Sequence, residues 1–221
     1  MNESYLALIG DVRGSRRHPD RAALQSSLRD ALEAANAAHE PAVALAITAG
    51  DELQGLLAAE QAARAVDLLV ELTETLHPVE LSFGLGWGPL ATRLEPGGSV
   101  SELDGPCFHR ARDALERAKK ESSWTRIEGL GPDLYALVSG VFGLMAAVRA
   151  GWTGKQAAYV RDARRAERYK DVAELHSVVP SVVTESLQAA QYRAMLRAED
   201  GVRAALAAFG CGREPGTGSP E

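Results

Sequence analysis

Two patterns of apolar residues alternate through the first 130 residues of the chain. Apolar runs of strand length alternate with stretches in which apolar residues recur every three or four positions, the spacing of a helix with one buried face. Two of the apolar runs flank a Gly-Asp pair, which is typical of a hairpin turn. Strands are expected at 5–9, 42–48, 53–57, 79–85 and 124–128, and helices at 19–39, 59–76 and 108–120. This order predicts an α+β domain with a ferredoxin-like βαββαβ sheet and its helices on one face.

The pattern changes after residue 130, where one segment with helical spacing follows another and no segment has the pattern of a strand. The most apolar stretch, 135–148, is shorter than the roughly 18 residues that a membrane-spanning helix needs, so a buried helix is expected there. Three regions are therefore predicted: an α/β domain over 1–130, an all-α domain over 131–209, and a disordered tail over 210–221, which is rich in Gly and Pro.

Composition places the chain among soluble globular proteins, with 46% apolar and 24% charged residues in 221. The N-terminus has no basic and apolar signal segment, and the two cysteines have no zinc-site or disulfide-framework spacing, so a cytoplasmic protein without membrane contact is expected. Charge is distributed unevenly. Residues 1–144 hold 13 Lys+Arg against 21 Asp+Glu, whereas 145–209 hold 10 against 7. A basic C-terminal third favours a nucleic-acid partner for that region.

Residues 169–187 carry the spacing of a helix-turn-helix. A small residue in the first helix, Ala173, allows close packing of the second, whose outer face is then free to enter the major groove of DNA. Pro180 suits the first turn of that second helix. Polar and basic side chains are the predicted base and phosphate contacts: Arg164, Arg165, Lys170, Ser181, Thr184, Gln188 and Gln191. A three-helix bundle without a ligand has the same pattern, and Ser177 stands where such turns prefer glycine. The run 152–195 resembles region four of the sigma factors.

Carboxylates cluster in the first domain, where Asp11 ends the first strand and Asp51 and Glu52 lie at the hairpin turn. If the first strand pairs with the hairpin, these side chains converge and suit a Mg²⁺ ion bound together with substrate phosphates. Gly10 and Gly50 would allow the backbone to approach a phosphate. The alternative is an ordinary hairpin turn and an ordinary loop aspartate.

Four ordered motifs give a family resemblance: 8–16 (LIGDVRGSR), 48–56 (TAGDELQGL), 83–88 (FGLGWG) and 104–112 (DGPCFHRAR). Together with the helix-turn-helix they resemble the SatD family of bacterial proteins over most of the chain. The same N-terminal motifs are similar to the class III nucleotidyl cyclase and GGDEF core. That resemblance implies metal binding by Asp11 and Asp51, with Glu52 as a substitute, and nucleotide contacts from Arg110 and Arg112. The asparagine that binds the ribose in cyclases has no evident counterpart.

The leading hypothesis from the sequence is a DNA-binding regulator whose N-terminal domain senses a purine nucleotide or metal-nucleotide. A homodimer is expected, because paired helix-turn-helix units read paired half-sites. The alternative is an enzyme, a Mg²⁺-dependent nucleotidyl cyclase or nucleotidyltransferase acting on ATP or GTP, with the helical domain as a targeting module. An interaction scaffold that uses neither site is a third possibility.

Overall fold

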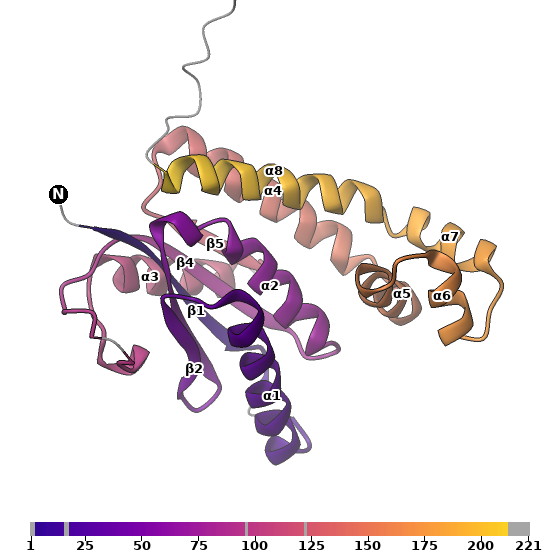
Figure 1. The fold of residues 1–221 in the computed structure, drawn as a ribbon, viewed down its shortest axis with the longest axis horizontal. Coiled ribbons are helices and arrows are strands. Elements are labelled where there is room, and N and C mark those ends of the chain that lie inside the picture. The colour runs from indigo at the N-terminus through magenta and orange to yellow at the C-terminus, as the bar shows by residue number, and fades with distance from the viewer. Residues whose placement is uncertain (1–2, 16–17, 96, 122, 212–221) are drawn as a thin grey trace, which may run out of the picture.

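The computed structural model describes residues 3–15, 18–95, 97–121 and 123–211. The strands are β1 (Ser4–Val12), β2 (Val43–Ala49), β3 (Glu52–Ala58), β4 (Leu81–Pro89) and β5 (Thr125–Glu128). The helices are α1 (Arg21–His39), α2 (Arg64–Thr75), α3 (Pro106–Lys120), α4 (Pro132–Ala150), α5 (Gly154–Arg165), α6 (Tyr169–Leu175), α7 (Pro180–Ala189) and α8 (Tyr192–Gly210), with short 3-10 turns η2 (Ala59–Gln61) and η3 (Val100–Glu102). The predicted order of strands and helices is confirmed (Figure 1).

The strands form one sheet in the order β2-β3-β1-β4-β5. β1 pairs antiparallel with both β3 and β4, and β2 pairs antiparallel with β3, which is the ferredoxin-like arrangement that the sequence predicts. β5 adds a strand parallel to β4 at the edge of the sheet, reached through α3. The ends of β1 and of the β2–β3 hairpin therefore lie side by side.

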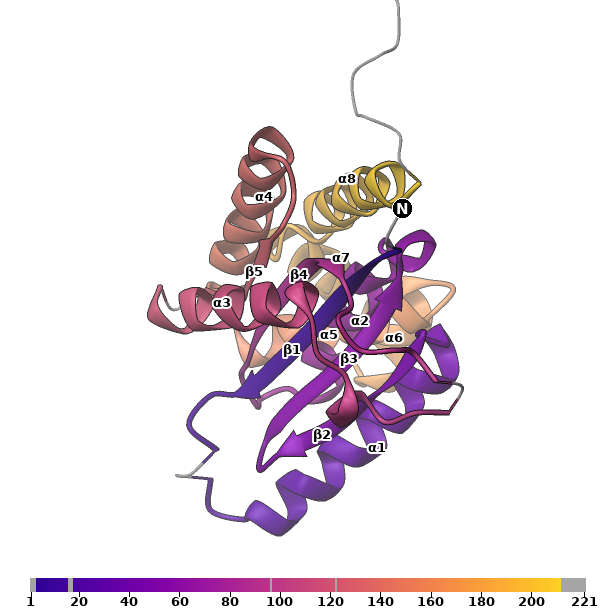
Figure 2. The same ribbon diagram turned by 90° about the vertical axis from the view of Figure 1, so that its left-hand side faces the viewer.

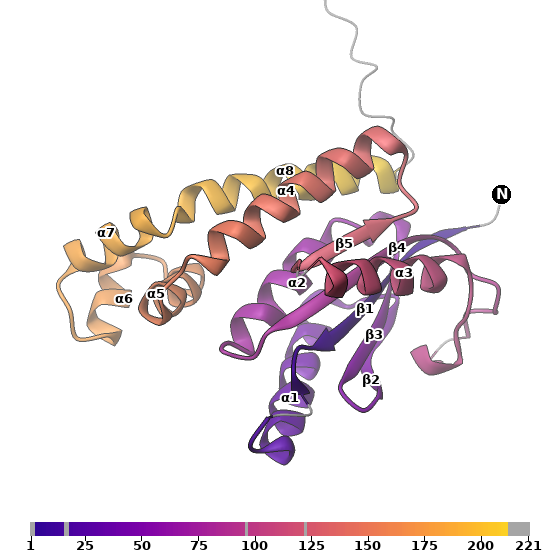
Figure 3. The same cartoon turned by 180° about the vertical axis from the view of Figure 1, so that it is seen from behind.

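The helices cover both faces of the sheet, so the prediction that they share one face is wrong for α3. Helices α1 and α2 lie on one face and α3 on the other, as the opposite views of Figures 1 and 3 show. The physical reason lies in β4, where Gly84 and Gly86 point toward α3. A Cβ atom on Gly84 would stand 2.1 Å from the carbonyl oxygen of Ala111, and one on Gly86 would stand 2.0 Å from that of Cys107. These glycines let α3 pack directly on the backbone of β4.

One hydrophobic core joins the sheet to two of the C-terminal helices. Leu134, Val138, Phe142 and Met145 of α4 and Met195, Val202 and Leu206 of α8 belong to the same buried cluster as the side chains of β1, α1 and α2. Figure 2 shows α4 and α8 side by side along the end of the α/β domain. The core therefore runs across the boundary predicted at residue 130, while α5, α6 and α7 surround a core of their own.

Helix α4 is buried on one side only. The predicted helix is present, but it is not the buried helix that the sequence predicts, because only 22% of its most apolar 18-residue window is buried. By length and composition alone it is long and apolar enough to cross a membrane. Leu137 is 59% exposed and Leu144 is 71% exposed, because both point away from the core. At the other end of the chain α8 extends to Gly210, so the predicted tail does not include that residue. Residues 212–221 lie outside the described part of the chain.

Candidate functional site

The end of β1 brings two acidic side chains together on the face of the sheet that α3 covers. Asp11 stands opposite Glu52 in the β1–β3 ladder and opposite Ser82 in the β1–β4 ladder. Residues directly opposite each other in neighbouring strands point to the same side and lie within contact distance. The convergence of Asp11 and Glu52 that the sequence predicts is therefore present.

Two cations from α3 lie against this acidic pair. Lys119 Nζ is 3.0 Å from Asp11 Oδ2. Arg112 donates from both terminal nitrogens to Glu52, with Nη2 2.7 Å from Oε1, and Gln54 donates to the same carboxylate at 2.8 Å. The pKa of Glu52 lies below its usual value, chiefly because of the hydrogen bonds from Arg112, although burial acts in the opposite direction. Glu52 is therefore ionised at neutral pH and holds a fixed partner.

Arg112 was predicted from the cyclase resemblance, whereas Lys119 was missed by sequence reasoning. A signal for Lys119 existed, because a residue seven positions after Arg112 lies on the same face of a helix. Arg110 behaves differently from Arg112. Its Nη1 donates to the carbonyl oxygen of Trp87 at 2.6 Å, near the end of β4 that pairs with the start of β1. Arg110 thus lies at the opposite end of the sheet from Asp11, and its assignment to the same nucleotide site is wrong.

The hairpin turn places the remaining predicted residues. Gly50 has φ of +65° and nothing within 4 Å of an added Cβ, so the turn needs its conformational freedom. Gln25 of α1 donates to its carbonyl oxygen at 2.6 Å, which fixes the turn against the helix. Asp51 is partly exposed, next to Glu52. Gly10 is explained by packing. A Cβ at this position would lie 2.7 Å from Leu53, on the face of the sheet opposite to Asp11.

The carboxylates of Asp11, Asp51 and Glu52 are the right kind of ligand for a hard divalent cation, but they are not arranged around one. Carboxylate oxygens are the ligands that Mg²⁺ prefers, usually one or two of them together with substrate phosphates. Within the described residues, however, no group of three or more His, Cys, Asp or Glu side chains is gathered closely enough to hold a metal ion. Asp11, Asp51 and Glu52 would therefore need to rearrange around an ion, with Lys119 and Arg112 moving off two of them.

The second candidate region is the unit formed by α5, α6 and α7. Ala173 of α6 and Val183 of α7 are both buried, and they belong to the same hydrophobic cluster. The connection between α6 and α7 contains Ser177 in the left-handed region, with φ of +54°, which explains why this position favours glycine in such turns. Two short helices joined by a tight turn and braced by a third thus form a compact unit.

Six of the seven predicted DNA contacts are exposed, and Arg164 is the exception. Ser181, Thr184 and Gln188 lie exposed on α7, and Lys170 is exposed on α6. Arg165, at the end of α5, is exposed and donates from Nη2 to Thr75 Oγ1 of α2 at 3.3 Å. Gln191 is exposed too, but it follows the end of α7 as the N-cap residue of α8.

Arg164 does not face solvent, so its prediction as a phosphate contact is wrong. Its Nη1 donates to Glu199 at 2.8 Å, and its Nε donates to Glu74 at 2.7 Å. Burial opposes the charge of Arg164, but the hydrogen bonds to Glu199 and the charge of Glu74 outweigh it and raise the arginine pKa. Arg164 therefore ties α5 to α2 and α8 instead of offering a charge to a ligand.

These features define the class of protein: a ferredoxin-like α+β domain with an appended helical module that shares its core. The sequence matches the SatD family over residues 5–206, and the chain belongs to that family. No curated protein matches the sequence well enough to count as a relative.

Solved structures with a similar fold include three nucleotidyl cyclases. A bacterial light-regulated adenylyl cyclase has 13% sequence identity and a TM-score of 0.44 over 56% of this chain and 74% of its own. The guanylyl cyclase domain of the RhoGC fusion protein from the aquatic fungus Blastocladiella emersonii has 18% identity and a TM-score of 0.40 over 52% and 74%. The adenylyl cyclase CyaB from P. aeruginosa has 16% identity and a TM-score of 0.39 over 53% and 73%. At these values the similarity decides nothing about activity.

Proposed function

We propose that the α/β domain binds a purine nucleoside triphosphate together with Mg²⁺ at the end of β1 and the β2–β3 turn. The observation that carries the proposal is the pairing of Asp11 and Glu52 on one face, with Lys119 and Arg112 held against them. Opposite charges lie side by side where β1 ends and β3 begins, and they supply both kinds of group that a metal-triphosphate needs.

The expected chemistry divides the roles between the two charges. The carboxylates of Asp11, Asp51 and Glu52 would hold the ion. Arg112 and Lys119 would then leave these carboxylates and bind the phosphate oxygens. An arginine suits this exchange because its planar fork binds phosphate as well as carboxylate. The bound ion would neutralise the triphosphate and orient it. After this exchange the carboxylates face the metal ion and the cations face phosphate oxygens, so each charged side chain has a neighbour of opposite charge.

The first test is binding of ATP and GTP by isothermal calorimetry, with Mg²⁺ or with EDTA. Asp51→Ala removes a predicted ligand from an exposed turn and should abolish the metal-dependent binding while leaving the fold intact. Asp30→Ala, an exposed acid on α1, is the control for net charge and should bind as the parent protein does. Unchanged nucleotide affinity in Asp51→Ala would remove the site assignment.

Turnover is tested separately, because binding and catalysis need not coincide. If the domain is a nucleotidyl cyclase or nucleotidyltransferase, micromolar protein should convert ATP or GTP to product, and Asp11→Ala should stop the conversion. A protein that binds nucleotide without forming product is a sensor in the sense of the regulatory hypothesis.

A second candidate function, DNA binding by α6 and α7, is favoured by one specific observation. The outer face of α7 presents Ser181, Thr184 and Gln188 to solvent, while its inner face is buried through Val183 and Leu187. Such a helix has the polar surface that reads base edges in the major groove. A homodimer belongs to this proposal, because two copies would read two half-sites.

Fluorescence anisotropy on DNA from the gene's own promoter region, at two salt concentrations, tests this function. Gln188→Ala should relax sequence preference. Lys170→Ala should weaken binding to all sequences and reduce the salt slope by about one unit. Arg93→Ala, an exposed arginine of the α/β domain, is the matched control. The absence of binding by the parent protein at both salt concentrations would dismiss the DNA-binding role.

A further inference from the structure

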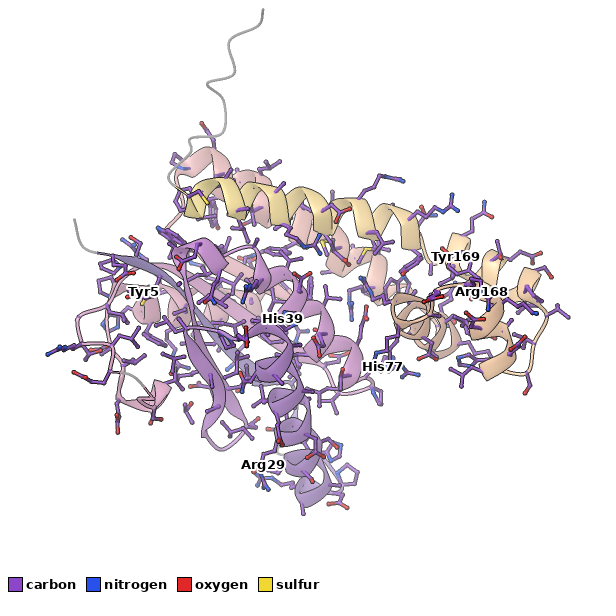
Figure 4. The ribbon with its side chains drawn as sticks, viewed as in Figure 1. Tyr5, Arg29, His39, His77, Arg168 and Tyr169 are labelled. Carbon is purple, nitrogen blue, oxygen red and sulfur yellow. The ribbon has the colours of Figure 1, made fainter. Side chains whose placement is uncertain are left out.

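A cleft lies between the α/β domain and the helical module formed by α4 to α8. Its volume is about 320 Å³. One wall comes from the end of α2, residues 77–81 and Trp124, and the other from the end of α4, Trp152 and α5. Figure 4 shows His77 on the side of the α/β domain that faces α5. Both modules therefore contribute to one cavity, whose size falls at the lower end of the range for small-molecule sites.

Arg149, at the end of α4, brings a buried guanidinium group to the cleft. Its side chain is only 15% exposed, and its guanidinium lies 5.3 Å from the ring of Trp124 and 5.2 Å from that of Trp152. Within the described residues, its buried Nη1 has no hydrogen-bond acceptor. A buried donor of this kind is destabilising unless an acceptor reaches it.

The nearest carboxylate is not available to Arg149. Glu74 Oε1 lies 3.9 Å from Arg149 Nη1, beyond hydrogen-bonding distance, and it already accepts from Arg164 at 2.7 Å. Burial lowers the pKa of Arg149, and the charge of Glu74 offsets only part of that effect. The two tryptophan rings hold the guanidinium in place by stacking without satisfying its N–H groups.

The cleft holds charged groups of both signs, with Arg13 and Arg149 on one side of the balance and Glu74 and Glu80 on the other. Arg13 donates to two neutral oxygens, Ser82 Oγ at 2.6 Å and the carbonyl of Ser123 at 2.5 Å. Burial and the charges of Arg149 and Arg161 lower the pKa of His77, which favours its neutral imidazole and adds no positive charge. The cleft thus combines two guanidinium groups and two carboxylates with indole surfaces and the small side chains of Ala146, Ala150 and Ala157.

We infer that this cleft binds a small organic oxyanion, a carboxylate or a phosphate on a compact apolar body, with Arg149 as its anchoring cation. The oxyanion would accept from the free Nη1 of Arg149, and the apolar body would lie against Trp152 and the alanines. Because such a ligand touches both modules, it would stabilise their present arrangement. This site shares no residue with the proposed nucleotide site, so a failure to bind nucleotide would not contradict this inference.

The test uses tryptophan fluorescence, because two of the three tryptophans of the chain line the cleft. Trp87, the third, packs against Phe209 elsewhere. In a Trp87→Phe background the remaining signal comes from Trp124 and Trp152. Inorganic phosphate and benzoate are titrated separately, so that the response identifies phosphate or carboxylate as the preferred group. A saturable change with at least one of them is expected.

Two variants assign the response to the cleft. Arg149→Met should weaken binding roughly ten-fold or more, as expected when a charge-assisted hydrogen bond is lost, while Arg93→Met at the surface should leave it unchanged. Circular dichroism checks that Arg149→Met is folded. If it is not, Ala150→Leu, which fills the cleft from an exposed helix end, decides in its place with the same expected loss. No saturable response to either probe, or parent-like affinity in the deciding variant, would overturn the inference.

Discussion

At the residue scale, burial decides what a charged side chain does in this protein. Arg164 belongs to a run of basic residues that resembles a solvated, phosphate-binding surface, yet it lies between Glu74 and Glu199. Glu199 is 2% exposed, and a carboxylate so deeply buried is tolerated only with a cation and hydrogen bonds beside it. The three side chains come from α5, α2 and α8, so they fasten the helical unit to the rest of the molecule.

Removal of one member of this cluster should therefore be costly. Glu199→Ala removes the acceptor of Nη1 and Nη2 of the buried Arg164, whose Nε keeps Glu74, and is expected to lower the free energy of unfolding by about 3–5 kcal/mol. The neighbouring Asp200→Ala is the control, since Asp200 is 72% exposed and pairs with Arg203 at the surface, where such pairs contribute at most about 1 kcal/mol. Urea unfolding measures both. Equal, small losses in the two variants would contradict a structural role for the cluster.

At the scale of elements, the alternation of glycine along β4 determines where α3 lies. Gly84 and Gly86 present a flat strip of backbone, and α3 rests on it through Cys107, Ala111 and Leu115. Because α3 also carries Arg112 and Lys119, this close approach sets the position of the cations opposite Asp11 and Glu52. The glycines thus act on the candidate site through helix placement, without contacting a ligand.

A pair of Gly→Ala substitutions tests this explanation. Gly86→Ala should destabilise the protein by about 1–3 kcal/mol, because its Cβ would meet the backbone of α3 and force the helix outward. Gly140→Ala, on α4 with nothing within 4 Å of the added atom, should stabilise it by about 0.5–1 kcal/mol through helix propensity. Thermal or urea unfolding gives both values. A neutral Gly86→Ala would show that α3 does not need this contact.

At the scale of the whole molecule, the α/β domain and the long helices α4 and α8 share one hydrophobic core. Phe142 of α4 is fully buried and contacts Trp124 edge-on, with ring centroids 5.8 Å apart. The helical module therefore supplies part of the core that covers the sheet. We expect a single unfolding transition in which tryptophan fluorescence and far-ultraviolet circular dichroism coincide.

The same helix offers a matched pair of variants. Phe142→Ala should cost about 3–5 kcal/mol of stability, as large buried aromatic side chains do, and should shift both spectroscopic transitions together. Leu144→Ala, two residues further on and 71% exposed, should stay within about 0.5 kcal/mol of the parent protein. A fluorescence transition that stays in place while the helical signal shifts would indicate two independent domains.

The sequence by itself determined the elements, their order and the meeting of Asp11 with the hairpin. These follow from local periodicity, turn residues and strand order, which neighbouring positions in the chain encode. The tertiary structure alone decided that Arg164 is buried, that Arg110 lies at the far end of the sheet and that Lys119 faces Asp11. Arg164 and Glu74 are 90 positions apart in sequence. The environment of a charge is set by residues that only folding brings together, and a local pattern carries no record of them.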